Sequence, residues 1–107
     1  MELLTKSQSK ALQAAFLKHD EIKDHKCLVK LFNPVGRGTW WIIDQDPKDE
    51  DYLWCVAKLF DDIGPEVGSV SLSDMQKTKG FGGLGIERDI HFKPMLVSEI
   101  MEKERAR

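Results

Sequence analysis

The sequence predicts an α+β fold, a single domain with a four- or five-stranded, mostly antiparallel sheet and N- and C-terminal helices packed on it. Three observations lead to this class. Apolar residues recur at helical spacing near both ends of the chain, short apolar segments alternate with turn residues between them, and the first strands are joined by short connections. Short connections favour antiparallel pairing, because a parallel pair needs a crossover of about a dozen residues or more.

The first helix is predicted over residues 6–18. Thr5 is followed three positions later by Gln8, which is the pattern of a capping box. Leu12 lies at the helical spacing of a face that packs on the sheet. His19 lies near the helix end, where its charged form would interact favourably with the helix dipole.

The sheet region is predicted over about residues 26–92. Its strands are rich in β-branched and aromatic residues and are bounded by turn residues. Ser71 can cap a short helix at residues 72–78, and Pro94 suits the first turn of a last helix at residues 94–104. The predicted strands are residues 27–32, 39–44, 52–60, 66–70 and 86–92.

Composition limits the functional classes. The chain has 107 residues, which fits one domain over residues 1–107, and its 32% charged and 41% hydrophobic residues are typical of a globular protein. A net charge of -2 argues against a dedicated nucleic-acid binder, which usually carries a basic excess. The sequence has no apolar run of about 20 residues and no signal-peptide core, so we expect a cytoplasmic protein without a membrane span.

Two cysteines, Cys27 and Cys55, are expected to be reduced thiols inside strands. They do not form a Cys-x-x-Cys motif, which is the spacing most typical of a zinc site. The sequence therefore predicts no metal site and no cofactor.

The segment around the last predicted strand concentrates the most chemistry. A glycine-rich loop, residues 79–85, precedes it and resembles no phosphate-binding motif, so a mobile loop is expected there. Alternation along a strand would place Glu87, Asp89 and His91 on one side, where they could bind a divalent metal or carry acid–base chemistry. The alternative is the ordinary solvent-facing side of an edge strand.

Arg88 lies between apolar residues of that strand, where an unpaired charge would be costly to bury. We expect it to contact at least one carboxylate at the end of another strand, either to fix the sheet register or to bind an anion at the mouth of a cleft. The expected partners are Asp44, Asp62 and Glu66. The candidate site comprises Glu87, Arg88, Asp89, His91, Asp44 and Glu66.

Trp40 and Trp41 are neighbours on a predicted strand, so they must point to opposite faces of the sheet. Core packing accounts for both if helices cover both faces. If one face is open, an exposed tryptophan could anchor a protein interface or, with Arg37, stack on a base of single-stranded nucleic acid.

Several segments together resemble an uncharacterised bacterial family of small single-domain proteins, labelled only as a domain of unknown function. The similarity runs from about Leu3 to Phe92 and is most specific at Gly83-Leu84-Gly85-Ile86-Glu87-Arg88-Asp89-Ile90-His91-Phe92. Members are typically carried on plasmids, integrative elements and prophages, so the resemblance implies an accessory role in a mobile genetic element and no particular reaction. The chain departs from the family pattern at Asp44, Lys58 and Phe60, where glutamate, aspartate and glycine are expected.

These observations leave three functional hypotheses. The first is a non-enzymatic interaction protein of a mobile element that binds a protein partner. The second is a small enzyme or anion-binding domain that uses the Glu87–His91 segment. The third is single-stranded nucleic-acid binding through Trp40 or Trp41, which the net charge disfavours.

Overall fold

The computed structural model describes residues 2–60, 62–78 and 85–105 and confirms the predicted α+β class. The helices are α1 (Lys6–Leu17), the 3₁₀ helix η1 (His19–Glu21), α2 (Leu72–Lys77) and α3 (Val97–Glu104). The strands are β1 (Lys26–Cys27), β2 (Val29–Phe32), β3 (Thr39–Asp46), β4 (Asp49–Lys58), β5 (Glu66–Ser71), β6 (Glu87–Arg88) and β7 (Met95–Leu96).

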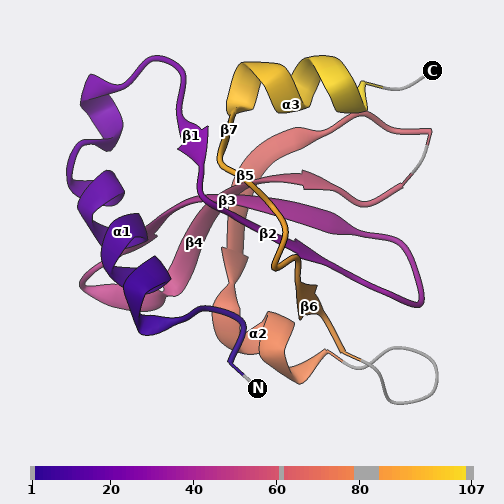
Figure 1. Cartoon of the computed structure of the whole chain (residues 1–107), viewed down its shortest axis with the longest axis horizontal. Coiled ribbons are helices and arrows are strands. Elements are labelled where there is room, and N and C mark those ends of the chain that lie inside the picture. The colour runs from indigo at the N-terminus through magenta and orange to yellow at the C-terminus, as the bar shows by residue number, and fades with distance from the viewer. Residues whose placement is uncertain (1, 61, 79–84, 106–107) are drawn as a thin grey trace.

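One antiparallel sheet of five strands has the order β5-β4-β3-β2-β6, and β1 pairs separately with β7 (Figure 1). None of the helices in the described part of the chain is long and apolar enough to cross a membrane. The long hairpin of β3 and β4 forms the middle of the sheet, so every other element is placed relative to it.

Helix α1 begins at the predicted capping box. Thr5 Oγ1 accepts a hydrogen bond from Gln8 N at 3.0 Å, and Gln8 Oε1 accepts one from Thr5 N at 3.0 Å. Leu3 and Leu4, just before the cap, are buried, and Leu12 within the helix is fully buried. The helix is therefore held against the sheet both at its first turn and at its middle.

Each face of the sheet has its own core. Leu12 of α1 packs in one core, against which Trp40 is half-buried, and Ile100 of α3 packs in the other together with Trp41. The two neighbouring tryptophans therefore point to opposite faces, as predicted. We call these the α1 face and the α3 face.

The central hairpin is longer than the predicted strands 39–44 and 52–60. β3 runs to Asp46 and β4 begins at Asp49. The connection is short because Asp46 Oδ1 accepts a hydrogen bond from Lys48 N at 2.8 Å. The register also shifts between Ile42 and Asp44, which marks a β-bulge in β3.

The predicted strand 86–92 was too long. β6 ends at Arg88, because Asp89 starts a turn in which its Oδ1 accepts a hydrogen bond from His91 N at 2.9 Å and its carbonyl accepts one from Phe92 N at 3.2 Å. Most of the preceding glycine-rich loop, residues 79–84, lies outside the described residues.

Two other boundaries differ because β1 and β7 pair with each other. Lys26 and Cys27 pair with β7, whereas Val29–Phe32 pair with β3, so the predicted strand 27–32 is divided into β1 and β2. The last helix starts at Val97 rather than near Pro94, since the two residues before it are the strand β7.

Candidate functional site

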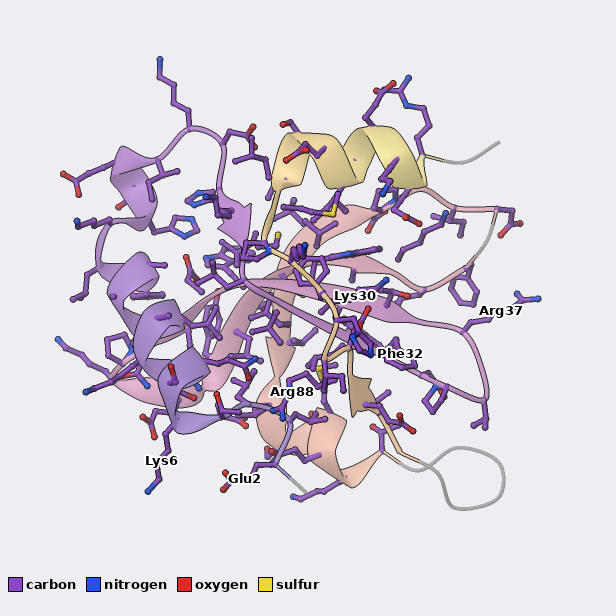
Figure 2. The ribbon with its side chains drawn as sticks, viewed as in Figure 1. Glu2, Lys6, Lys30, Phe32, Arg37 and Arg88 are labelled. Carbon is purple, nitrogen blue, oxygen red and sulfur yellow. The ribbon has the colours of Figure 1, made fainter. Side chains whose placement is uncertain are left out.

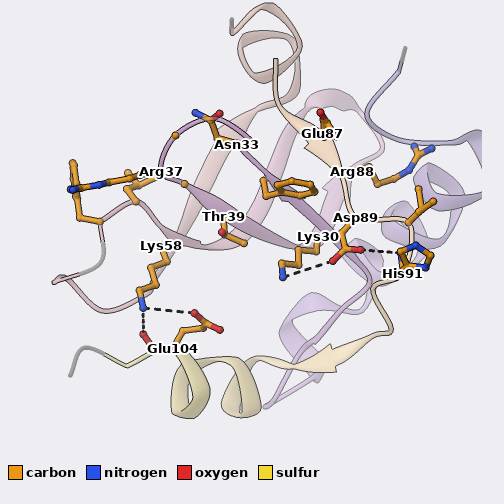
Figure 3. Close-up of a pocket in the computed structure, with 16 residues that line it drawn as sticks. Lys30, Asn33, Arg37, Thr39, Lys58, Glu87, Arg88, Asp89, His91 and Glu104 are labelled. Atoms are coloured by element: carbon orange, nitrogen blue, oxygen red, sulfur yellow. Dashed lines mark hydrogen bonds and ion pairs between the residues drawn. The ribbon is translucent and has the colours of Figure 1, made fainter. Parts of the chain in front are cut away.

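An open groove lies on the α3 face, beyond the C-terminal end of α3 (Figure 3). Its volume is about 790 Å³, within the range of about 300–1,000 Å³ that is typical of ligand sites. The register places Phe32 opposite Thr39 and Thr39 opposite Lys58, so these side chains share one face and form its floor. The walls come from the turn between β2 and β3, the residues just after β4, the segment Glu87–His91, and Glu104 at the end of α3.

The charged side chains of the groove are mostly paired with one another. Lys30 Nζ lies 3.8 Å from Asp89 Oδ2. Lys58 Nζ lies 3.7 Å from Glu104 Oε1 and donates a hydrogen bond to the Glu104 carbonyl at 2.8 Å. A lysine at the end of α3 also complements the helix dipole. These pairs leave the groove electrostatically balanced near its floor.

The apolar side chains of the groove are left exposed. Ile90 is 76% exposed, and Leu59 and Phe60 are about half exposed. Val35 and Ile63 belong to the segments that carry the groove walls, and they are exposed as well. Large apolar side chains gathered at a concave surface are typical of an interaction site.

Arg88 contacts none of the three expected carboxylates, Asp44, Asp62 and Glu66, so that prediction was wrong. Its Nη1 donates hydrogen bonds to the carbonyl of Leu3 at 2.9 Å and to Gln8 Oε1 at 3.4 Å. Arg88 stands opposite Leu31 in the register, so its side chain belongs to the α1 face and points away from Lys30 and Lys58 (Figure 3). It ties the N-terminal segment to β6 and supplies no free charge to the groove.

The candidate residues predicted from the sequence are therefore only partly brought together. Glu87, Asp89 and His91 line the groove, as does the backbone region of Arg88. Glu66 lies exposed on β5, opposite Ala57, and is not part of the groove. Asp44 lies elsewhere in β3 and is fully buried.

Asp44 meets two residues that the sequence analysis did not select as a site. Its Oδ2 lies 2.5 Å from His19 Nδ1, and ligand atoms of His19, His25 and Asp44 all lie within 4.8 Å of one another. The two imidazole rings are 4.3 Å apart between centroids. We call these three residues the histidine cluster.

The surroundings of His25 favour its neutral form. Burial lowers the pKa of His25, and the positive charge of His19 lowers it further, while nearby carboxylates, foremost Asp44, act in the opposite direction.

The sequence signal that could have indicated the histidine cluster was weak. It consists of an aspartate that continues the apolar run Trp40–Ile43 without a polar neighbour before it.

The candidate aromatic contacts are not open platforms. Trp41 is 3% exposed, because α3 covers its face of the sheet, and Trp40 is half-buried against the core of the α1 face. Arg37 extends from the β2–β3 turn away from the body of the protein (Figure 2). The described residues do not place an exposed tryptophan beside it.

Comparison with known proteins places the chain in one family. The family described as "Protein of unknown function (DUF2958)" matches residues 3–105, so the chain belongs to it. No curated protein and no solved structure matches the chain.

Proposed function

We propose that this member of the DUF2958 family is a non-enzymatic binding module that holds an extended segment of a protein partner in the groove of the α3 face. The observation that carries this proposal is the contrast within the groove. Its two lysines are paired with carboxylates, whereas its large apolar side chains are exposed. Such a surface gains free energy by covering apolar area rather than by reacting with a charged substrate.

The chemistry of the groove defines the partner segment. Leu59, Phe60 and Ile90 offer contacts for two or three apolar anchor side chains. Arg37 stands on the groove wall and forms no ion pair with the described residues, so a carboxylate on the segment would complement it. We therefore expect an extended segment with apolar anchors and at least one acidic residue.

The same contacts favour binding over catalysis. Arg88 is engaged with the N-terminal segment, and Asp89 is shared between Lys30 and the amide of His91. These polar groups are already engaged with other parts of the protein, so they are not free to bind a reacting substrate. The family resemblance adds a setting, in which the partner is a protein of a mobile genetic element or of its host.

Peptide display tests this proposal. A library of random linear peptides is selected on the immobilised protein, and the dissociation constants of the enriched peptides are measured by fluorescence anisotropy. We expect enriched peptides to carry apolar anchors with an acidic residue. We expect Ile90→Ser to weaken their binding by about tenfold, equivalent to the loss of one anchoring contact of about 1.4 kcal/mol.

Leu17→Ser is the matched control. Leu17 is 75% exposed on α1, almost the same as Ile90 at 76%, and it does not line the groove. Arg37→Glu should weaken the acidic peptides and spare variants in which the acidic residue is neutralised. The proposal fails if no peptide is enriched or if Leu17→Ser weakens peptide binding as much as Ile90→Ser does. It also fails if the groove binds only small anions and Ile90→Ser does not change their affinity.

A further inference from the structure

We propose that His19, His25 and Asp44 bind a divalent transition-metal ion of the Zn²⁺ type. The site is separate from the groove and independent of the function proposed for it. Three ligand side chains lie close together there, and one buried carboxylate oxygen has no partner among the described residues.

Three different segments converge to build the cluster. His19 begins η1 directly after α1, and His25 immediately precedes β1. The β-bulge in β3 brings Asp44 into register with Trp54, and it therefore shares the face of that tryptophan. Trp54 in turn stacks on the His19 ring at 5.9 Å between centroids, which holds the imidazole over the carboxylate. Bulges often re-aim a side chain next to a functional site, and this bulge does so for Asp44.

The carboxylate of Asp44 is incompletely satisfied. The side chain is fully buried, and Oδ1 has no hydrogen-bond partner among the described residues, although Oδ2 contacts His19. An unpaired buried carboxylate oxygen carries a desolvation penalty that proteins rarely leave uncompensated. A cation bound between this carboxylate and the two imidazoles would remove the penalty.

The donor set selects the kind of ion. Two imidazoles and one carboxylate suit zinc and related first-row ions, and three protein ligands leave at least one position for water or another ligand. Ca²⁺ and Mg²⁺ prefer oxygen ligands, so two imidazoles disfavour them. Cys27 and Cys55 are buried free thiols, and neither belongs to the group of ligand atoms that lie within 4.8 Å of one another.

His19 has a route to solvent, since its side chain is 28% exposed. A metal ligand must be unprotonated at the atom that binds, so a proton held on His19 Nδ1 is displaced when the ion binds there. His19 Nδ1 and Asp44 Oδ2 now lie 2.5 Å apart. Ligand bonds of about 2.0 Å in a tetrahedral site would separate them to roughly 3.3 Å, a movement that a side-chain rotation supplies.

Calorimetric titration of the full chain with Zn²⁺ tests the site. We expect one equivalent to bind, with an observed heat that varies with the ionisation enthalpy of the buffer because binding displaces ligand protons. Co²⁺ should give the visible absorption of a four- or five-coordinate ion. His25→Gln should weaken Zn²⁺ binding by at least about tenfold. His25 is half-buried and forms no hydrogen bond through its side chain among the described residues, so this variant should still fold.

His91→Gln is the matched control, because it removes the remaining histidine of the chain at an exposed position in the groove. It should bind Zn²⁺ like the unaltered protein. Asp44→Asn keeps the shape of the side chain and should also abolish tight binding. The proposal is overturned if the unaltered protein does not bind Zn²⁺ at micromolar concentration, or if His25→Gln and His91→Gln weaken binding equally.

Discussion

The groove and the histidine cluster handle charge in opposite ways. In the groove, Lys30 and Lys58 lie at the surface beside carboxylates, at 3.8 and 3.7 Å. In the cluster, Asp44 is fully buried and one of its oxygens has no partner among the described residues. The groove thus has paired lysines and uncovered apolar surface, whereas the cluster has a buried carboxylate with an unpaired oxygen. This contrast is why we propose a segment with apolar anchors for the groove and a cation for the cluster.

The two sites also differ in how they depend on the core. His19 follows α1 directly, so the position of the cluster depends on how that helix packs. The groove is formed by strand ends and turns, and Arg37, Leu59, Phe60 and Ile90 are exposed there. Core substitutions should therefore disturb the cluster, and substitutions of the exposed groove side chains should leave stability almost unchanged.

The largest effect is expected for Leu12→Ala. Leu12 lies in α1 and is fully buried against the sheet, and truncating a buried leucine costs about 2–5 kcal/mol of unfolding free energy. Urea unfolding measures the loss, and the Zn²⁺ affinity of the variant should fall as well, because α1 positions His19. The comparison breaks down if Leu12→Ala costs no more than Ile90→Ala in the groove, which should stay within about 0.5 kcal/mol.

A second, smaller effect is expected for Gly38→Ala, at the point where the groove meets the core. Gly38 lines the groove with φ at +124°, and an added Cβ would lie 2.6 Å from Cη2 of Trp40. Strain of this kind costs about 1–3 kcal/mol and should show in urea unfolding, together with a change in tryptophan fluorescence.

Gly68→Ala is the control for this substitution, because a Cβ at Gly68 would meet no atom within 4 Å. Its unfolding midpoint should stay close to that of the unaltered protein. Equal losses of stability in both glycine variants would mean that strain at Gly38 is not the cause of the loss in Gly38→Ala.

Features whose causes are local in sequence were predictable. The capping box of Thr5 and Gln8 determines the start of α1, and the alternation of Trp40 and Trp41 determines which face each one covers. The two-residue strands were not predictable, since β1 exists through its pairing with β7, about 70 residues away in the chain.

The histidine cluster shows the same limit more sharply. His19 and Asp44 are 25 positions apart, and their contact depends on a β-bulge that no residue type in the sequence indicates. The prediction that Arg88 contacts a carboxylate was wrong for a related reason. The rule that a half-buried arginine needs a partner was correct, but backbone carbonyls and Gln8 met the need instead of a carboxylate.

The smallest effect concerns Asp51, a carboxylate whose two oxygens are both satisfied. Its Oδ2 accepts a hydrogen bond from Ser71 Oγ at 2.6 Å, and its Oδ1 accepts one from Ser73 N at 2.6 Å. The hydrogen bond from Ser71, followed by those from Ser73, lowers the pKa of Asp51 from its ordinary value of 3.8. Asp51 is therefore the satisfied counterpart of Asp44.

The sign of the pH dependence follows from that shift. Between the lowered pKa and 3.8, the unfolded chain binds more protons than the folded one, so stability rises with pH there. The stabilisation by Asp51 is complete above that window and is lost as the pH falls through the folded pKa. Urea unfolding of the unaltered protein and of Asp51→Asn should show a difference that is constant near neutral pH and shrinks below pH 3.8. If the difference in stability between the two proteins stays constant through this window, the hydrogen bonds from the two serines do not favour the charged carboxylate. Asp51 would then not be a satisfied counterpart with which Asp44 can be compared.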